Sequence, residues 1–177
     1  MSAVTLTADE LVGALDALGV RFLTGGEASP RARSLTPADL LAQLAGQPDA
    51  RLRLAIIPLL LRRPEFAVAA PAAAEQITGQ TRWTLKLHYS AAVLLQRHYR
   101  NPLARLLGAQ PPLPDLFRSE LGVSLASDSQ EGLRQLGERH ATLTGLSINW
   151  AGTYDHAAQR LIKRLEHEAI WATPQAA

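Results

Sequence analysis

Apolar residues recur along much of the chain with the spacing of one face of an α-helix. Near the start, Leu11, Leu15 and Leu18 follow one another at intervals of four and three residues. Thr7 and Glu10 precede them in the Thr-x-x-Glu pattern of a capping box, in which two side chains satisfy free N–H groups of the first helical turn. The pattern therefore predicts a first helix that begins after Thr7 and ends near Leu18.

Two later segments carry the same kinds of signal. Thr36 followed by Pro37 predicts the start of a short second helix, which ends at Gly46. A last helix is indicated by one continuous apolar side, and Thr153 is its expected N-cap. That side consists of Tyr154, Ala158, Leu161, Leu165 and Ala169.

Prolines interrupt the helical pattern in the middle of the chain. Residues 49 to 66 begin with alternating Arg and Leu, as in a strand, but the wider run is rich in Leu and Ala. We therefore favour a buried helix that is kinked at Pro58. The longest helix is expected to follow Gly79 and to run to about Asn101, where Pro102 kinks or restarts it.

A proline-rich run divides the chain. The segment AQPPLP, residues 109 to 114, has the composition of a stiff connector. Residues 1 to 108 are expected to form a helical core with a mobile loop at residues 24 to 35, where the helical period is lost. Residues 115 to 177 are expected to hold a short helix over about 115 to 121 and two longer ones, packed on the core or forming a C-terminal helical subdomain.

Composition supports an all-α fold. Leu and Ala supply 31 and 30 of the 177 residues, whereas Val and Ile together supply only 12. Straight-chain residues favour helices and β-branched residues favour strands. We therefore expect one compact all-α domain of about seven or eight helices.

Several chemistries are disfavoured by residues that the sequence lacks. Without cysteine the chain forms no disulfide and no Cys-ligated zinc site. The longest apolar run, Ala55 to Leu61, is far shorter than the about 20 residues that span a bilayer. A Gly-Lys-Ser/Thr phosphate loop, a His-Glu-x-x-His zinc motif and a Gly-x-Ser-x-Gly nucleophile elbow are all missing. We expect a cytoplasmic, non-enzymatic protein that needs neither metal nor cofactor and does not enter membranes.

Positive charge is concentrated in the middle of the chain. The net charge is only +2, but no acidic residue lies between Glu75 and Asp115. Such a stretch, here called the basic helix (residues 82 to 105), would attract phosphates or an acidic partner. Its candidate binding residues are Arg82, Lys86, Arg97, Arg100, Arg105 and Tyr89. A structural role stays open, because Tyr99 shares a helical side with Leu103.

Three Arg residues precede a His at a spacing that places both side chains on one helix face. The pairs are Arg82 and His88, Arg134 and His140, and Arg160 and His167. In such a pair the His can act as general acid or base while the Arg stabilises a phosphorane. The spacing resembles that of the HEPN superfamily, small all-helical RNases that act as dimers, and implies a metal-independent RNase. Trp83 departs from that family, which commonly has a polar residue after the Arg.

Polar and aromatic residues also gather in residues 138 to 156, around a predicted turn between two helices. Loops held by rigid helices often carry function. We therefore regard Asn149, Trp150, Tyr154 and His156 as a secondary candidate rim. The structural alternative is that Trp150 fills the core and Asp155 complements the dipole of the last helix.

Two segments resemble parts of small helical bacterial proteins that are paired with nucleotidyltransferases. They are RLAIIPLLLRRPEFA, residues 53 to 67, and ERHATLTGLSINWAGTYDHAAQRL, residues 138 to 161. The resemblance implies an antitoxin-like or accessory protein. We therefore expect a non-catalytic helical protein that binds a protein partner, such as a nucleotidyltransferase, or a second copy of itself. A nucleic-acid-binding module built on the basic helix is the alternative, and an HEPN-like RNase is the third.

Overall fold

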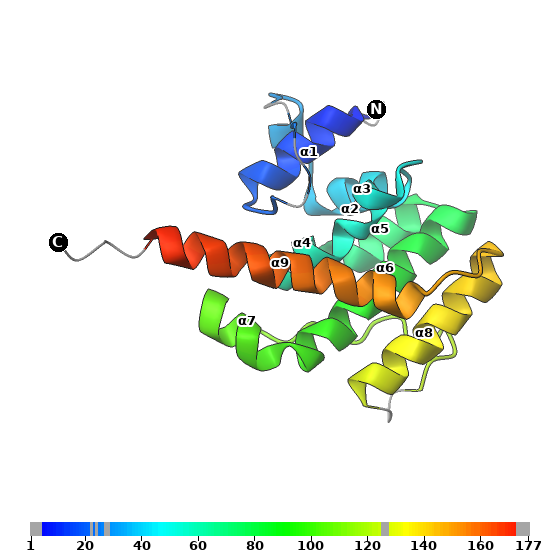
Figure 1. The fold of residues 1–177 in the computed structure, drawn as a ribbon. Coiled ribbons are helices and arrows are strands. Elements are labelled where there is room, and N and C mark those ends of the chain that lie inside the picture. Colours follow the sequence, from blue (N-terminus) through cyan, green and yellow to red (C-terminus); the bar gives the residue numbers. More distant parts are fainter. Residues whose placement is uncertain (1–4, 22, 24, 27–28, 125–127, 173–177) are drawn as a thin grey trace.

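The computed structural model describes residues 5–21, 23, 25–26, 29–124 and 128–172. These residues form helices joined by turns and loops, with no strand among them, which confirms the all-α prediction (Figure 1). The α-helices are α1 (Ala8–Ala17), α2 (Pro37–Ala45), α3 (Ala50–Leu54), α4 (Ile56–Arg62), α5 (Ala70–Gln76), α6 (Gly79–His98), α7 (Arg100–Leu107), α8 (Ser129–Thr144) and α9 (Trp150–Ala172). Two 3-10 helices accompany them, η1 (Ala32–Ser34) and η2 (Pro64–Ala69).

Helix α6 occupies the centre of the fold. Every residue from Thr84 to Leu95 is buried, and α6 contacts α2, α3, α4, α5, α7, α8 and α9. In Figure 1, α9 crosses in front of α4 and α6. Because residues Thr84 to Leu95 are covered on all sides, buried polar groups there need partners inside the protein. Lys86, His88 and Tyr89 have such partners, whereas the Ser90 hydroxyl has none among the described residues.

One hydrophobic core includes residues from both sides of the proline-rich connector. Helices α8 and α9 pack against α6, and α9 also packs against α4. The connector itself follows α6 closely, because the Gln96 side chain donates to the Pro111 carbonyl at 3.0 Å and accepts from the Leu113 N–H at 2.7 Å. The C-terminal helices therefore complete the core of the N-terminal part.

Side-chain caps define several helix ends. Thr7 and Thr36 cap α1 and α2, as predicted. The predicted cap of the last helix is wrong. Its true cap is Asn149, whose Oδ1 accepts a hydrogen bond from the Gly152 N–H at 2.9 Å. Thr153 lies within the first turn and donates its hydroxyl to the Asn149 carbonyl at 2.9 Å.

Two prolines break helices about one turn earlier than predicted. Helices α3 and α4 meet at Ala55, three residues before Pro58, and α6 and α7 meet at Tyr99, three residues before Pro102. A proline has no N–H to donate to the carbonyl four residues back, and its ring crowds that turn. The backbone change therefore falls before each proline instead of at it.

One prediction outside the long helices is corrected by the structure, and the predicted mobility of residues 24 to 35 stays a prediction. Residues 117 to 122 form a bend and turns instead of the short helix expected over 115 to 121, and Gly122, with φ of 72°, ends this segment as predicted. The expected mobile loop at residues 24 to 35 ends in η1, and Ser29 donates its hydroxyl to a carboxylate of α1 at 2.7 Å. Other residues of that loop, at positions 24, 27 and 28, lie outside the described residues.

Helices α8 and α9 approach each other closely at Gly137, where an added Cβ atom would lie 3.0 Å from the backbone nitrogen of Ala151. We predict that Gly137→Val lowers the free energy of unfolding by about 2 kcal/mol, because the side chain forces packed helices apart. Urea denaturation followed by circular dichroism measures the change. Thr142→Val places the same side chain at an exposed position of α8 and should cost less than about 0.5 kcal/mol. Equal effects would show that the two helices are not tightly packed there.

Candidate functional site

Part of the basic helix lies inside the protein. Lys86 is only 7% exposed, and its ammonium group forms an ion pair with Glu120. Tyr89 is fully buried and donates its hydroxyl to the Pro114 carbonyl at 2.9 Å. The prediction that Lys86 and Tyr89 line an outer binding face is therefore wrong. The physical reason is the enclosure of α6, which turns Tyr89 toward the end of the connector and Lys86 toward the segment that follows it.

The exposed part of the basic helix is paired with acids from elsewhere in the chain. Arg97 lies 3.8 Å from the Asp115 carboxylate, and Arg105 lies 3.4 Å from the Glu166 carboxylate. Arg100 is exposed. Carboxylates from other segments therefore lie beside this stretch in the folded protein, although the stretch itself contains none. They make its positive potential weaker than predicted. Partner binding by these three Arg residues stays a prediction.

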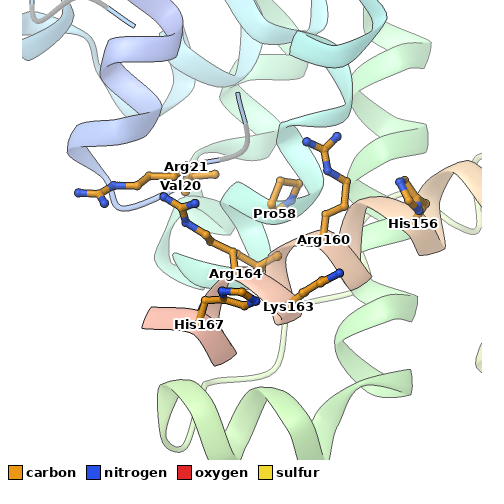
Figure 2. Close-up of a pocket in the computed structure, with 9 residues that line it drawn as sticks. Val20, Arg21, Pro58, His156, Arg160, Lys163, Arg164 and His167 are labelled. Atoms are coloured by element: carbon orange, nitrogen blue, oxygen red, sulfur yellow. The ribbon is translucent and has the colours of Figure 1, made fainter. Parts of the chain in front are cut away.

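A second basic surface, which the sequence analysis did not predict, lies on α9. It is a groove of about 450 Å³ between α9, α4 and the segment after α1, here called the basic groove. Its charged or imidazole-bearing lining residues are Arg21, His156, Arg160, Lys163, Arg164 and His167, and none of its lining residues is acidic. Figure 2 shows Arg160 and Arg164 on either side of the Pro58 ring, with Arg21 on the neighbouring segment.

The spacing of residues on α9 produces the basic groove. His156, Arg160, Lys163 and His167 recur at intervals of four, three and four residues, which keeps them on one side of a helix. The buried residues of α9 pack on the core, and one of them, Leu161, lies at the floor of the basic groove. The signal was therefore present in the sequence as a helical stripe, although only His156 and the Arg160–His167 pair were singled out.

Positive charge exceeds negative charge around the basic groove. Glu168 lies 3.7 Å from Arg164 and 3.2 Å from Arg62, so one carboxylate serves two guanidinium groups. Within the described part of the chain, neither Lys163 nor Arg21 forms an ion pair. Like charges gathered in a hollow concentrate a positive potential, which attracts anionic groups.

Two large apolar side chains extend this side of α9 toward its C-terminal end. Ile170 is 70% exposed and Trp171 is 86% exposed. They follow His167 by three and four residues, so they lie on the same side of the helix as the basic groove. Tryptophan and arginine are the residues most enriched in the parts of protein interfaces that contribute most to affinity.

A separate site brings two buried histidines together. The rings of His88 on α6 and His140 on α8 have their centroids 5.6 Å apart, and each residue is 2% exposed. Nδ1 of His88 donates to the Thr84 carbonyl at 2.7 Å, and Nδ1 of His140 is hydrogen-bonded to the Tyr154 hydroxyl. The His140 ring stacks on Trp150 with centroids 3.5 Å apart. These contacts join α6, α8 and α9.

His140 also lines a polar pocket of about 230 Å³, here called the histidine pocket. Its other polar lining residues are Gln47, Arg53, Gln80, Thr81, Thr84 and Thr144, and none of its lining residues is acidic. The pocket lies where the end of α2 and the helix α3 meet α6, α8 and the start of α9.

Both buried histidines are neutral at physiological pH. The pKa of His88 is lowered to about 4 and that of His140 to about 3, mainly by burial and in smaller part by the positive charge of Arg53. The hydrogen bond to the Thr84 carbonyl opposes this shift for His88. Burial raises the pKa of Tyr154 well above its usual value, so that its hydroxyl keeps its proton.

The first two Arg and His pairs do not assemble as predicted. Arg82 is half-buried and donates to the Ile77 carbonyl at 2.8 Å, and Arg134 forms ion pairs with Glu131 and Glu138. Their histidines are the two buried ones, and the cation that influences both rings is Arg53, from a different helix. Only the third pair lines one pocket, the basic groove.

The four residues of the predicted rim belong to different parts of the structure. Asn149 caps α9, and Trp150 and Tyr154 are buried against His140. His156 lines the basic groove. The prediction that these four residues form one rim is therefore wrong. The reason is that α9 already begins at Trp150, and successive helical positions face different sides.

Comparisons with known proteins give no match: no protein-family model, no curated protein and no solved structure matches the chain. The resemblance to antitoxin-like accessory proteins therefore rests on the two quoted segments and stays a prediction. No helix in the described ranges is long and apolar enough to cross a bilayer. The same ranges contain no group of three or more His, Cys, Asp or Glu side chains that could hold a metal ion.

The buried histidines make stability depend on pH. Above the ordinary histidine pKa of 6.5, both rings are neutral whether the chain is folded or not, and they contribute no pH dependence. Below 6.5 the unfolded chain takes up protons, whereas the folded protein does so only near pH 4 for His88 and pH 3 for His140. We predict that lowering the pH from 7 to 5 reduces the free energy of unfolding by roughly 2 kcal/mol for each buried histidine.

Urea denaturation at pH 7 and at pH 5 measures this loss. His140→Gln should remove about half of it, because one of the two titrating rings is gone. His98→Gln, at an exposed position at the end of α6, should leave the loss unchanged. A wild-type protein that is equally stable at both pH values would contradict the prediction.

Proposed function

We propose that the protein is a non-catalytic helical binding protein that docks an acidic surface of a partner protein in the basic groove. The main support is a groove lined by six cationic or imidazole side chains with no acid among its lining residues. A complementary acidic surface is attracted over a distance and oriented as it approaches. It also supplies the carboxylates that Lys163 and Arg21 lack within the described chain.

Two observations favour a protein partner over a nucleic acid. Ile170 and Trp171 continue the basic side of α9 with exposed apolar area, which suits an apolar pocket on a protein. The net charge of +2 is small for nucleic-acid binding, whose affinity depends on many phosphate contacts. The partner we propose therefore combines carboxylates with an apolar patch.

The wider role that we propose is regulation of another enzyme in the cytoplasm. The resemblance to accessory proteins paired with nucleotidyltransferases supports an enzyme of that class as the partner, which the protein would neutralise or steer. The contact surface differs from the predicted one. Among the cations of the basic helix, Lys86, Arg97 and Arg105 each have a carboxylate from another segment, so the basic groove is the stronger attractor for an acidic surface.

The proposal predicts that charge reversal in the basic groove weakens binding to an acidic probe. Fluorescence anisotropy with a labelled peptide of alternating Glu and Leu measures affinity. We expect the double variant Lys163→Glu/Arg164→Glu to bind at least about tenfold more weakly than wild type, because attraction is replaced by repulsion. The matched control Arg97→Glu/Arg100→Glu reverses the same number of charges on the basic helix and should bind as wild type does. Trp171→Ala should weaken peptide binding without changing the helical circular-dichroism signal.

A labelled single-stranded RNA homopolymer serves as the competing probe. Tighter binding of RNA than of the peptide, with a steep loss of affinity as salt rises, would replace the proposal with a nucleic-acid-binding function. Weakening by the control pair alone would move the contact to the basic helix. Self-association of the wild type that the groove variant abolishes, measured by analytical ultracentrifugation, would make a second copy the occupant and would also overturn the proposal.

A further inference from the structure

The histidine pocket carries a cation without a counter-ion. Nη1 of Arg53 donates to the carbonyl oxygens of Gln47 and Pro48 at 2.6 and 2.7 Å. These contacts hold the guanidinium in place, but carbonyl groups do not neutralise its charge. In the described ranges Arg53 forms no ion pair, and it is only partly exposed. A partly buried charge is costly unless an opposite charge accompanies it.

His140, in the wall of the pocket, offers a buried hydrogen-bond donor at Nε2, and its contact with Tyr154 shows why. Tyr154 keeps its proton, and its only hydrogen bond to a described residue is to Nδ1 of His140. We assign the Tyr154 hydroxyl as the donor in this bond, because otherwise its buried proton would be unsatisfied. Nδ1 of the neutral His140 ring then accepts, and the ring proton resides on Nε2. The stack on Trp150, with the two rings within 10° of parallel, fixes the orientation of the imidazole.

The remaining polar lining is neutral. Thr81 and Thr84 contribute hydroxyl groups from α6, and Gln80 contributes an amide. Gln80 and Thr144 already donate to backbone carbonyls of α8, those of Leu143 and His140. The pocket therefore combines one fixed guanidinium and neutral donors with no carboxylate in its lining. That combination suits an anion and disfavours a cation.

We propose that the histidine pocket binds the carboxylate or phosphate group of a small molecule, with Arg53 as its charge partner and His140 as a hydrogen-bond donor. The volume of about 230 Å³ is below the roughly 300–1,000 Å³ of pockets for drug-sized ligands, so the ligand is smaller than a nucleotide. This site is distinct from the basic groove. It does not rest on the proposed partner binding.

Nuclear magnetic resonance of the histidine rings tests the proposal and separates the two sites. Inorganic phosphate and acetate are titrated into the full chain, with chloride at matched ionic strength as the control. We expect saturable shifts of the His140 and His88 ring signals with phosphate, acetate or both, and none with chloride. The pKa values of both rings should rise toward 6.5 on binding, since a bound anion opposes the charge of Arg53. Shifts confined to His156 and His167 would report binding in the basic groove only, and would overturn this proposal.

Arg53→Gln should weaken the saturable effect at His140 by at least tenfold, because the charge partner is lost. Arg51→Gln removes the same charge from an exposed position of the same helix and should leave it unchanged. Binding that persists in Arg53→Gln, or the absence of a saturable His140 shift with either anion in the wild type, would overturn the proposal. The wild-type titration decides the matter even if Arg53→Gln fails to fold.

Discussion

The enclosure of α6 is the constraint on which the rest of the structure depends. Because the middle of the helix is covered on every side, its charged and aromatic polar side chains there are not solvated by bulk water and are paired from within the protein. Lys86 pairs with Glu120, and Tyr89 donates to the Pro114 carbonyl. These contacts hold the end of the connector and the segment after it against α6. Helices α8 and α9 close the core over the remaining sides of this part of α6.

The same enclosure accounts for the chemistry of the buried histidines. His88 is carried into the core by α6, where desolvation outweighs any gain from a charged ring. His140 meets it from α8, and Tyr154 of α9 contacts both rings. Three helices are thus joined through neutral polar groups, at the place where a polar pocket opens beside Arg53. A satisfied buried polar network of this kind favours one arrangement of the helices.

Helix α9 contributes residues to both candidate sites. Comparison of α9 with α6 shows that the position of a basic side chain decides whether it is exposed or buried and paired. Its first residue, Trp150, lines the histidine pocket, while its middle portion lines the basic groove. α9 packs on the core along only part of its circumference, so Arg160 and Lys163 extend outward without a desolvation cost. On α6, which is covered all round, Lys86 instead pairs with a carboxylate. Comparable residues are therefore buried and paired on one helix and exposed on the other.

The sequence by itself determined the features that depend on residues three or four positions apart. The Thr7 and Thr36 caps, the end of α2 at Gly46 and the stripe of His156 to His167 are of this kind, because a helical turn brings such residues into contact whatever surrounds it. The helix breaks caused by Pro58 and Pro102 were also predictable from the sequence, although each break lies about one turn before the proline.

Only the tertiary structure decided which charges stay available and which rings meet. Arg97 pairs with Asp115, Arg105 pairs with Glu166, and the rings of His88 and His140 lie close together. The residues of each pair are far apart in the sequence, so the helical period does not predict their contact. Electrostatic potential and desolvation depend on distance and burial in space, and order along the chain does not specify either. Part of the stretch without acids in the sequence therefore gained carboxylate partners in the fold, and a second basic surface formed on another helix.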